Sequence, residues 1–171
     1  MKTLQQYINE WRFNKDTECV LLKPEKIEDL RIIIMNQLKL NNKKPNMSVI
    51  DVSNMKSLAD SFSTWSDNDG IIDYYGVDME KIEYIDLSDW DISKVKDLTS
   101  MFFGLTNVKE IDLSGWDVSN VEHMGGMFIG CKNLKEIKGI EDWDVSKVID
   151  MEDMFYECES LELPSWYNKA K

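Results

Sequence analysis

The sequence has few of the residues that metal and catalytic sites usually require. It contains one histidine, His123, and three cysteines, Cys19, Cys131 and Cys158, with no Cys-x-x-Cys spacing. A structural zinc site needs four such ligands at short spacings, so the sequence disfavours one. No serine or cysteine is placed by sequence to pair with His123 for nucleophilic catalysis. We therefore predict that the chain is not an enzyme and has no catalytic residues, metal or cofactor.

Long apolar runs are also missing. Runs such as RIIIM (31–35) are far too short to span a bilayer. The N-terminal stretch MKTLQQYINEW lacks the apolar region of a signal peptide. We therefore expect a cytoplasmic protein with no membrane partner. The length of 171 residues suits one domain, with or without a small extension.

Positive charge is scarce over most of the chain. Residues 47–171 contain 11 Lys/Arg and 26 Asp/Glu, a balance of −15. Residues 1–46 contain nine Lys/Arg and six Asp/Glu, a balance of +3. A surface with this surplus of carboxylates repels phosphate groups, which disfavours direct binding to nucleic acid or to an anionic membrane. A cationic partner suits the chain better.

The sequence is rich in copies of one motif. The segments DLSDWDISKVKDLTSMF (86–102), DLSGWDVSNVEHMGGMF (112–128) and EDWDVSKVIDMEDMF (141–155) place their tryptophans 26 and 27 residues apart, and a weaker copy covers 49–62. A period of 20–29 residues is typical of leucine-rich repeats. We therefore predict an α/β repeat fold, a leucine-rich-repeat-type solenoid of about four units of ~26 residues with an N-terminal helical and strand cap.

Aligned positions of the copies carry similar apolar side chains. Stacked copies would place equivalent residues about 4.8 Å apart, as in neighbouring strands. The stretches YIDLS and EIDLS alternate apolar and polar residues, which predicts short parallel strands, and V-x-x-M-x-x-M-F suits a helical turn. The clearest predicted column of the core consists of Phe62, Phe102, Phe128 and Phe155.

Three regions follow from these patterns. Residues 1–46 are predicted to form the cap, with two helices and a short strand between them. The second helix starts with Pro24 and ends near Asn41-Asn42. Residues 47–163 are the repeats, interrupted by an insertion at 63–84. Residues 164–171 form a tail whose Trp166 and Tyr167 either cover the last copy or remain exposed.

The recurrent Asp-x-Ser pairs have two interpretations. Each Asp and Ser can satisfy backbone N–H groups of its own turn, or stacked carboxylates can hold Ca²⁺, and the repetition in every copy favours the turn. The stretch DNDGIID (67–73) fails as an EF-hand loop, because Trp65 and Gly76 would occupy its first and last ligand positions. Cys131 and Cys158 fall in one column within disulfide reach, and we favour free, buried thiols.

The insertion is the best candidate for partner binding, because insertions in repeat arrays often form the binding face. Its aromatic residues lie among acids, which would suit a basic protein partner, although the aromatics could instead only pack the loop onto the fold. Two acids that end the predicted strands complete the candidate set. The candidate residues are Trp65, Asp67, Asp69, Asp73, Tyr74, Tyr75, Asp86 and Asp112.

The motif W-D-x-S-x-V…M-F-x-x-C resembles the repeats of the BspA-like leucine-rich-repeat family, a bacterial surface-protein repeat domain of unknown function. The resemblance is carried by DLSDWDISKVKDLTSMF, DLSGWDVSNVEHMGGMFIGCKNL and WDVSKVIDMEDMFYEC, and covers roughly residues 20–163. It implies a right-handed repeat fold that binds protein partners or host surfaces and brings no catalytic residues.

Three hypotheses for function follow. The first is a small cytoplasmic scaffold that binds a basic protein, monomeric by default. The second is an acidic mimic of nucleic acid, such as a phage inhibitor of host defence. The third is a surface adhesin.

Overall fold

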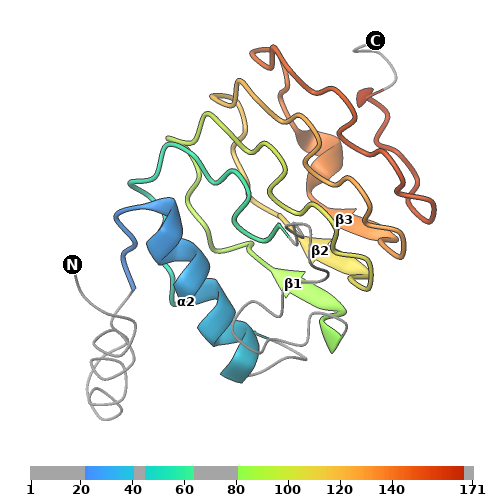
Figure 1. Ribbon diagram of the computed structural model, residues 1–171. Coiled ribbons are helices and arrows are strands. Elements are labelled where there is room, and N and C mark those ends of the chain that lie inside the picture. The colour runs from blue at the N-terminus through green and yellow to red at the C-terminus, as the bar shows by residue number, and fades with distance from the viewer. Residues whose placement is uncertain (1–21, 41–44, 64–80, 168–171) are drawn as a thin grey trace, which may run out of the picture.

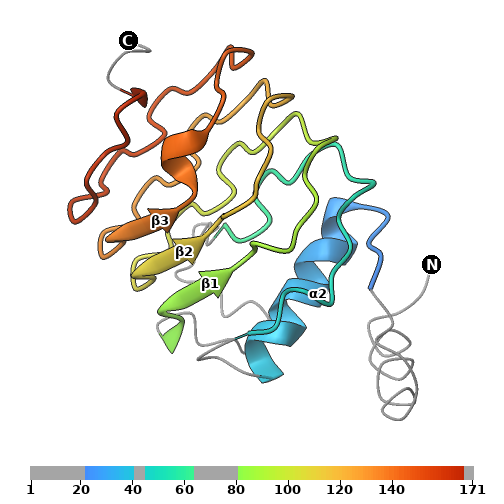
Figure 2. The same ribbon diagram turned by 180° about the vertical axis from the view of Figure 1, so that it is seen from behind.

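The computed structural model describes residues 22–40, 45–63 and 81–167 (Figures 1 and 2). Helix α2 (Ile27–Leu40) is followed by the strands β1 (Tyr84–Asp86), β2 (Glu110–Asp112) and β3 (Glu136–Lys138). A 3₁₀ helix, η3 (Ile140–Asp142), comes directly after β3. Both views show α2 at one end of the molecule and the segment after β3 at the other end.

Helix α2 forms where the sequence predicts it. Glu28 and Asp29 lie in its first turn and Lys39 in its last turn, so its charges complement the helix dipole. Leu30, Ile34 and Leu38 recur every four residues and are completely buried. Before the helix, Leu22 forms an isolated parallel bridge with Ile50, which ties this end of the chain to the first copy.

The strands form a parallel sheet in the order β1-β2-β3, as the alternating stretches predict. Equivalent residues pair directly, so that Ile85 lies beside Ile111 and Ile111 beside Ile137. These isoleucines are buried, and the residues on either side of them point away from the core. Both strand pairs join residues that are 26 positions apart, so a repeat of 26 residues sets the register of the sheet.

Away from the sheet, the copies are joined by a ladder of turns. Isolated parallel bridges connect Ser57 to Asp97, Asp97 to His123, and His123 to Asp150. Backbone amides of one copy donate to carbonyls of the following copy, for example Phe102 N to Met127 O at 2.9 Å. Successive copies are thus hydrogen-bonded on two sides, at the sheet and at these turns.

The predicted phenylalanine column is confirmed. Neighbouring rings stack with centroids 5.4 Å apart (Phe62 and Phe102), 5.2 Å apart (Phe102 and Phe128) and 5.4 Å apart (Phe128 and Phe155). At the C-terminal end, Tyr167 packs edge-on against Phe155 at 4.9 Å. Trp166 stacks on Trp143 at 6.2 Å, so these two aromatics cover the end of the column, which is the first of the two alternatives that the sequence left open.

The tryptophan side chains form a second series of contacts between copies. The indole N–H of Trp116 donates to Leu87 O, and that of Trp90 donates to Met47 O, both at 2.9 Å. The indole N–H of Trp143 is buried and has no partner among the described residues. This copy is the one in which an additional residue, Gly139, and η3 separate β3 from the tryptophan.

The predicted fold class is wrong. The described residues contain one α-helix and an open three-stranded parallel sheet, not a leucine-rich-repeat-type solenoid of four α/β units. The weak copy at 49–62 contributes no strand to this sheet, because Ile50 pairs with Leu22 instead. The segments expected as helical turns are successive turns that contain left-handed residues, such as Ser100 (φ 53°) and Asp153 (φ 54°), and this conformation interrupts an α-helix.

Other expectations lie outside the described residues. These are the first helix of the predicted cap, Cys19 and most of the insertion. Of the short strand expected in the cap, Leu22 is described and forms the bridge to Ile50. Within the described ranges, no helix combines the length and apolar character needed to cross a membrane.

Candidate functional site

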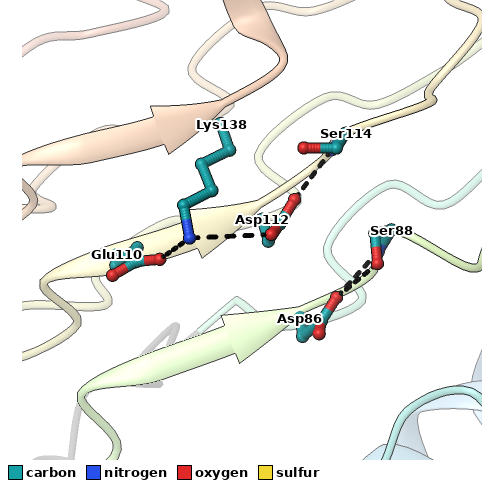
Figure 3. Close-up of polar contacts among 6 residues, drawn as sticks. All are labelled: Asp86, Ser88, Glu110, Asp112, Ser114 and Lys138. Atoms are coloured by element: carbon teal, nitrogen blue, oxygen red, sulfur yellow. Dashed lines mark hydrogen bonds and ion pairs between the residues drawn. The ribbon is translucent and has the colours of Figure 1, made fainter.

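The two candidate acids that the structure describes lie side by side where the strands end (Figure 3). Asp86 ends β1, Asp112 ends β2, and their backbones are direct neighbours in the sheet. Lys138 occupies the same position at the end of β3. We call these three residues the strand-end row. Because buried isoleucines precede all three, their side chains point away from the core.

Both acids of the strand-end row are used to build turns. Asp86 accepts hydrogen bonds from Ser88 N at 3.0 Å and from Ser88 Oγ at 2.7 Å. Asp112 accepts one from Ser114 N at 3.0 Å. Burial alone would raise the pKa of Asp86, but the hydrogen bonds from Ser88 and Tyr84 and the nearby charge of Lys138 together outweigh it and lower the pKa. Asp86 is therefore held in its charged form, suited to attraction of a cation rather than to proton transfer.

A lysine partly neutralises the row. Lys138 Nζ forms an ion pair with Glu110 and lies 3.8 Å from Asp112 Oδ2 (Figure 3). The hydrogen bond to Glu110 raises the pKa of Lys138. The same ammonium lies 5.9 Å from the centre of the Tyr84 ring. Burial, followed by the nearby charges of Asp86 and Asp112, raises the pKa of Tyr84, so its hydroxyl stays protonated at neutral pH.

The candidate residues in the insertion lie outside the described part of the chain. The structure therefore does not bring them together with the strand-end row or separate them from it. They are Trp65, Asp67, Asp69, Asp73, Tyr74 and Tyr75.

The Asp-x-Ser pairs are turn caps, as the favoured interpretation states. The carboxylates of Asp51, Asp91, Asp117 and Asp144 each accept a hydrogen bond at 3.0 Å from the backbone N–H two residues later. Each bond holds one carboxylate oxygen, Oδ1, on its own turn. Among the described residues, no group of three or more His, Cys, Asp or Glu side chains is placed to hold a metal ion.

Cys131 and Cys158 are buried free thiols, as predicted. Their Sγ atoms donate to Phe102 O and Phe128 O, which are equivalent carbonyls in successive copies. The neighbouring sulfur of Cys158, together with burial, raises the pKa of Cys131 and makes it a poor nucleophile. His123 lies in the bridge ladder between Asp97 and Asp150.

One surface feature was missed at the sequence level. Ile149 is 75% exposed and Tyr156 is 58% exposed, and both lie in the last copy. Ile149 occupies the position that Lys96 and Glu122 hold in earlier copies, since its amide donates to Glu122 O as that of Glu122 donates to Lys96 O. An apolar residue in a column of charged residues is the signal that could have identified it.

Together, the fold and these contacts define a small acidic protein in which copies of one motif form an open parallel sheet and a ladder of turns. The chain belongs to the family described as Mycoplasma protein of unknown function, DUF285, which matches residues 73–170, more than half of the chain. No curated protein and no solved structure matched the sequence.

Proposed function

We propose that this protein is a non-catalytic module that binds a basic protein partner. The observation that carries the proposal is the charge of residues 47–171, which contain 26 Asp/Glu against 11 Lys/Arg. Several lysines on the sheet side are already paired, as Lys109 is with Glu83 at 2.7 Å and Lys138 with Glu110. This pairing leaves a surplus of carboxylates for a cationic surface to contact.

The strand-end row and the insertion are the proposed contacts. The insertion ends at Tyr84, the first residue of β1, so it enters the sheet two residues before Asp86. Asp86 forms no ion pair with another described residue. Its carboxylate and that of Asp112 are fixed by their turns, so little side-chain freedom would be lost when a lysine or arginine binds. The resemblance to BspA-like repeats supports the same proposal.

The test begins with capture of the partner by cross-linking in lysate of the source cells. The purified partner is then titrated against the full chain by calorimetry. We expect a defined stoichiometry and weaker binding for the double variant Asp86→Asn/Asp112→Asn, because asparagine keeps an oxygen for the turn but removes the charge. Asp117→Asn makes the same change in a turn outside the strand-end row and should bind as the wild type does. Absence of any specific partner would refute the proposal.

The charge also favours a second candidate, an acidic mimic that occupies the binding site of a nucleic-acid-binding protein. In that case double-stranded DNA would compete with the chain for the partner, and affinity would fall steeply as salt increases. A complex that is insensitive to DNA excludes the mimic and leaves the binding module.

A further inference from the structure

The negative charge is concentrated in the last copy, residues 140–163, which we call the terminal copy. It contains nine Asp/Glu and one Lys, a balance of −8. The copy before it, residues 113–139, contains three Asp/Glu and three Lys, and so is balanced. Both views place the terminal copy at the end of the molecule opposite α2 (Figures 1 and 2). The acidic surplus therefore marks one end of the fold.

The same end exposes apolar side chains. Among the described residues, the exposed large hydrophobic ones are Ile149, Tyr156 and Leu163, all in the terminal copy. Beside them, Val148 and Met151 are only half-buried, although their equivalents Val121 and Met124 are completely buried. Val148 and Met151 thus have the apolar character of an interior copy without a neighbouring copy among the described residues to cover them.

The backbone at this edge also has unused donors. In the preceding copy, the amides of alternate residues donate to carbonyls of the terminal copy at 2.8–2.9 Å, as Phe128 N does to Met154 O. The equivalent amides of the terminal copy have no acceptor among the described residues. They belong to Met151, Asp153, Phe155 and Glu157. An unpaired edge of this kind can pair with a segment of another chain.

We propose that the edge formed by residues 145–157 of the terminal copy binds a basic segment of a partner protein. The inference rests on the proposed function and assigns the partner a second, specific contact. Carbonyls of the segment accept from the four free amides, apolar side chains cover Ile149 and Tyr156, and lysines or arginines lie near the surrounding carboxylates. Pairing between the same edges of two copies of this chain would bring two charges of −8 together, so such a dimer is disfavoured.

The probe is an eight-residue peptide of alternating Lys and Val, blocked at both ends. It is titrated against the full chain, with amide hydrogen exchange followed residue by residue by NMR. We expect peptide binding to slow exchange at the four free amides. A peptide of alternating Glu and Val is the control for charge and should produce no protection.

Two variants separate apolar contact from charge. Ile149→Glu introduces the residue type that Glu122 provides in the preceding copy, and it increases the negative charge. If Ile149 is covered by the peptide, binding weakens about tenfold, the loss expected for one well-covered aliphatic side chain. If charge alone attracts the peptide, binding strengthens. Glu136→Gln, an exposed change on β3, is the matched control and should leave the affinity within about twofold of wild type.

Three outcomes would overturn the inference. The first is that the Lys-Val peptide slows amide exchange at the strand-end row instead, and that Ile149→Glu binds the peptide as tightly as the wild type. This result would leave the proposed binding function standing. The second is equal protection by the Glu-Val peptide. The third is protection of the same amides without peptide, accompanied by a mass that increases with protein concentration, because a second copy would then be the occupant. Absence of any partner from the cross-linking experiment would count against the proposed function itself.

Discussion

The phenylalanine column makes the most direct prediction about stability. Phe102 is completely buried between Phe62 and Phe128, with ring centroids 5.4 and 5.2 Å away. Phe102→Ala removes both ring contacts and leaves a cavity in the interior, so we expect the free energy of unfolding to fall by about 3–5 kcal/mol. For a domain stabilised by about 5–15 kcal/mol, this is a large fraction of the total.

Urea unfolding followed by tryptophan fluorescence and circular dichroism measures the effect. Tyr156→Ala is the control, since Tyr156 is 58% exposed and its removal should cost no more than about 0.5 kcal/mol. A double-mutant cycle between Phe102 and Phe128 should give a coupling energy of about 0.5–1.5 kcal/mol from ring stacking. If Phe102→Ala unfolds within about 1 kcal/mol of the Tyr156→Ala control, the argument that stacked rings stabilise the fold is refuted.

Two further predictions concern the backbone and pH. Gly139 has φ of +82° and a Cβ there would lie 2.9 Å from Leu113 O, whereas Gly115 has φ of +85° with its nearest atom at 3.7 Å. In thermal unfolding, Gly139→Ala should therefore destabilise the protein by more than Gly115→Ala does. The cost of Gly115→Ala, about 1–2 kcal/mol, comes from its positive φ alone. Equal losses of stability in the two variants would contradict the steric argument. Hydrogen bonds from Ser53 and Lys23 lower the pKa of Asp51 from 3.8 to about 2. The ionised Asp51 therefore contributes its full stabilisation above pH 3.8, and this stabilisation is lost as the pH falls towards 2. Urea unfolding across this pH range should show that the free energy of unfolding falls more steeply with pH for the wild type than for Asp51→Asn. If the two proteins lose stability in parallel, Asp51 makes no such contribution.

Much of the local structure could be predicted because it depends on neighbouring residues or on the repeat itself. The Asp-x-Ser turns need only residues two apart, so Asp91 and Asp117 were assigned correctly without a fold. The strands follow from alternation around Ile85 and Ile111. The phenylalanine column follows from the period, since equal spacing places Phe102 beside Phe128 once the copies pair.

The fold class could not be predicted in the same way. Apolar residues at steps of three and four suit a helix, but Ser100 and Asp153 adopt positive φ, and their side chains give little warning of it. The weak copy at 49–62 resembles the others, yet Ile50 finds Leu22 as its partner, and only the three-dimensional arrangement shows this.

The candidate site was predicted in part for a related reason. Asp86 and Asp112 do lie together, because the sheet register follows the repeat. Ile149 occupies a position where Lys96 is already exposed in an interior copy, so its residue type is what makes it unusual. The partial exposure of Val148 and Met151 instead reflects where their copy lies in the chain, because the equivalent Val121 and Met124 are completely buried.

The direction of the hydrogen bonds in the turn ladder has an evolutionary consequence. Each interior copy repeats the same pattern, since amides such as Phe102 N donate to the copy after it and amides such as Glu122 N donate to the copy before it. An in-frame duplication of 26 codons, the interval between Trp90 and Trp116, would therefore insert a unit that fits both of its neighbours. Such a duplication would lengthen the array by one whole unit and leave the residues at its two ends unchanged.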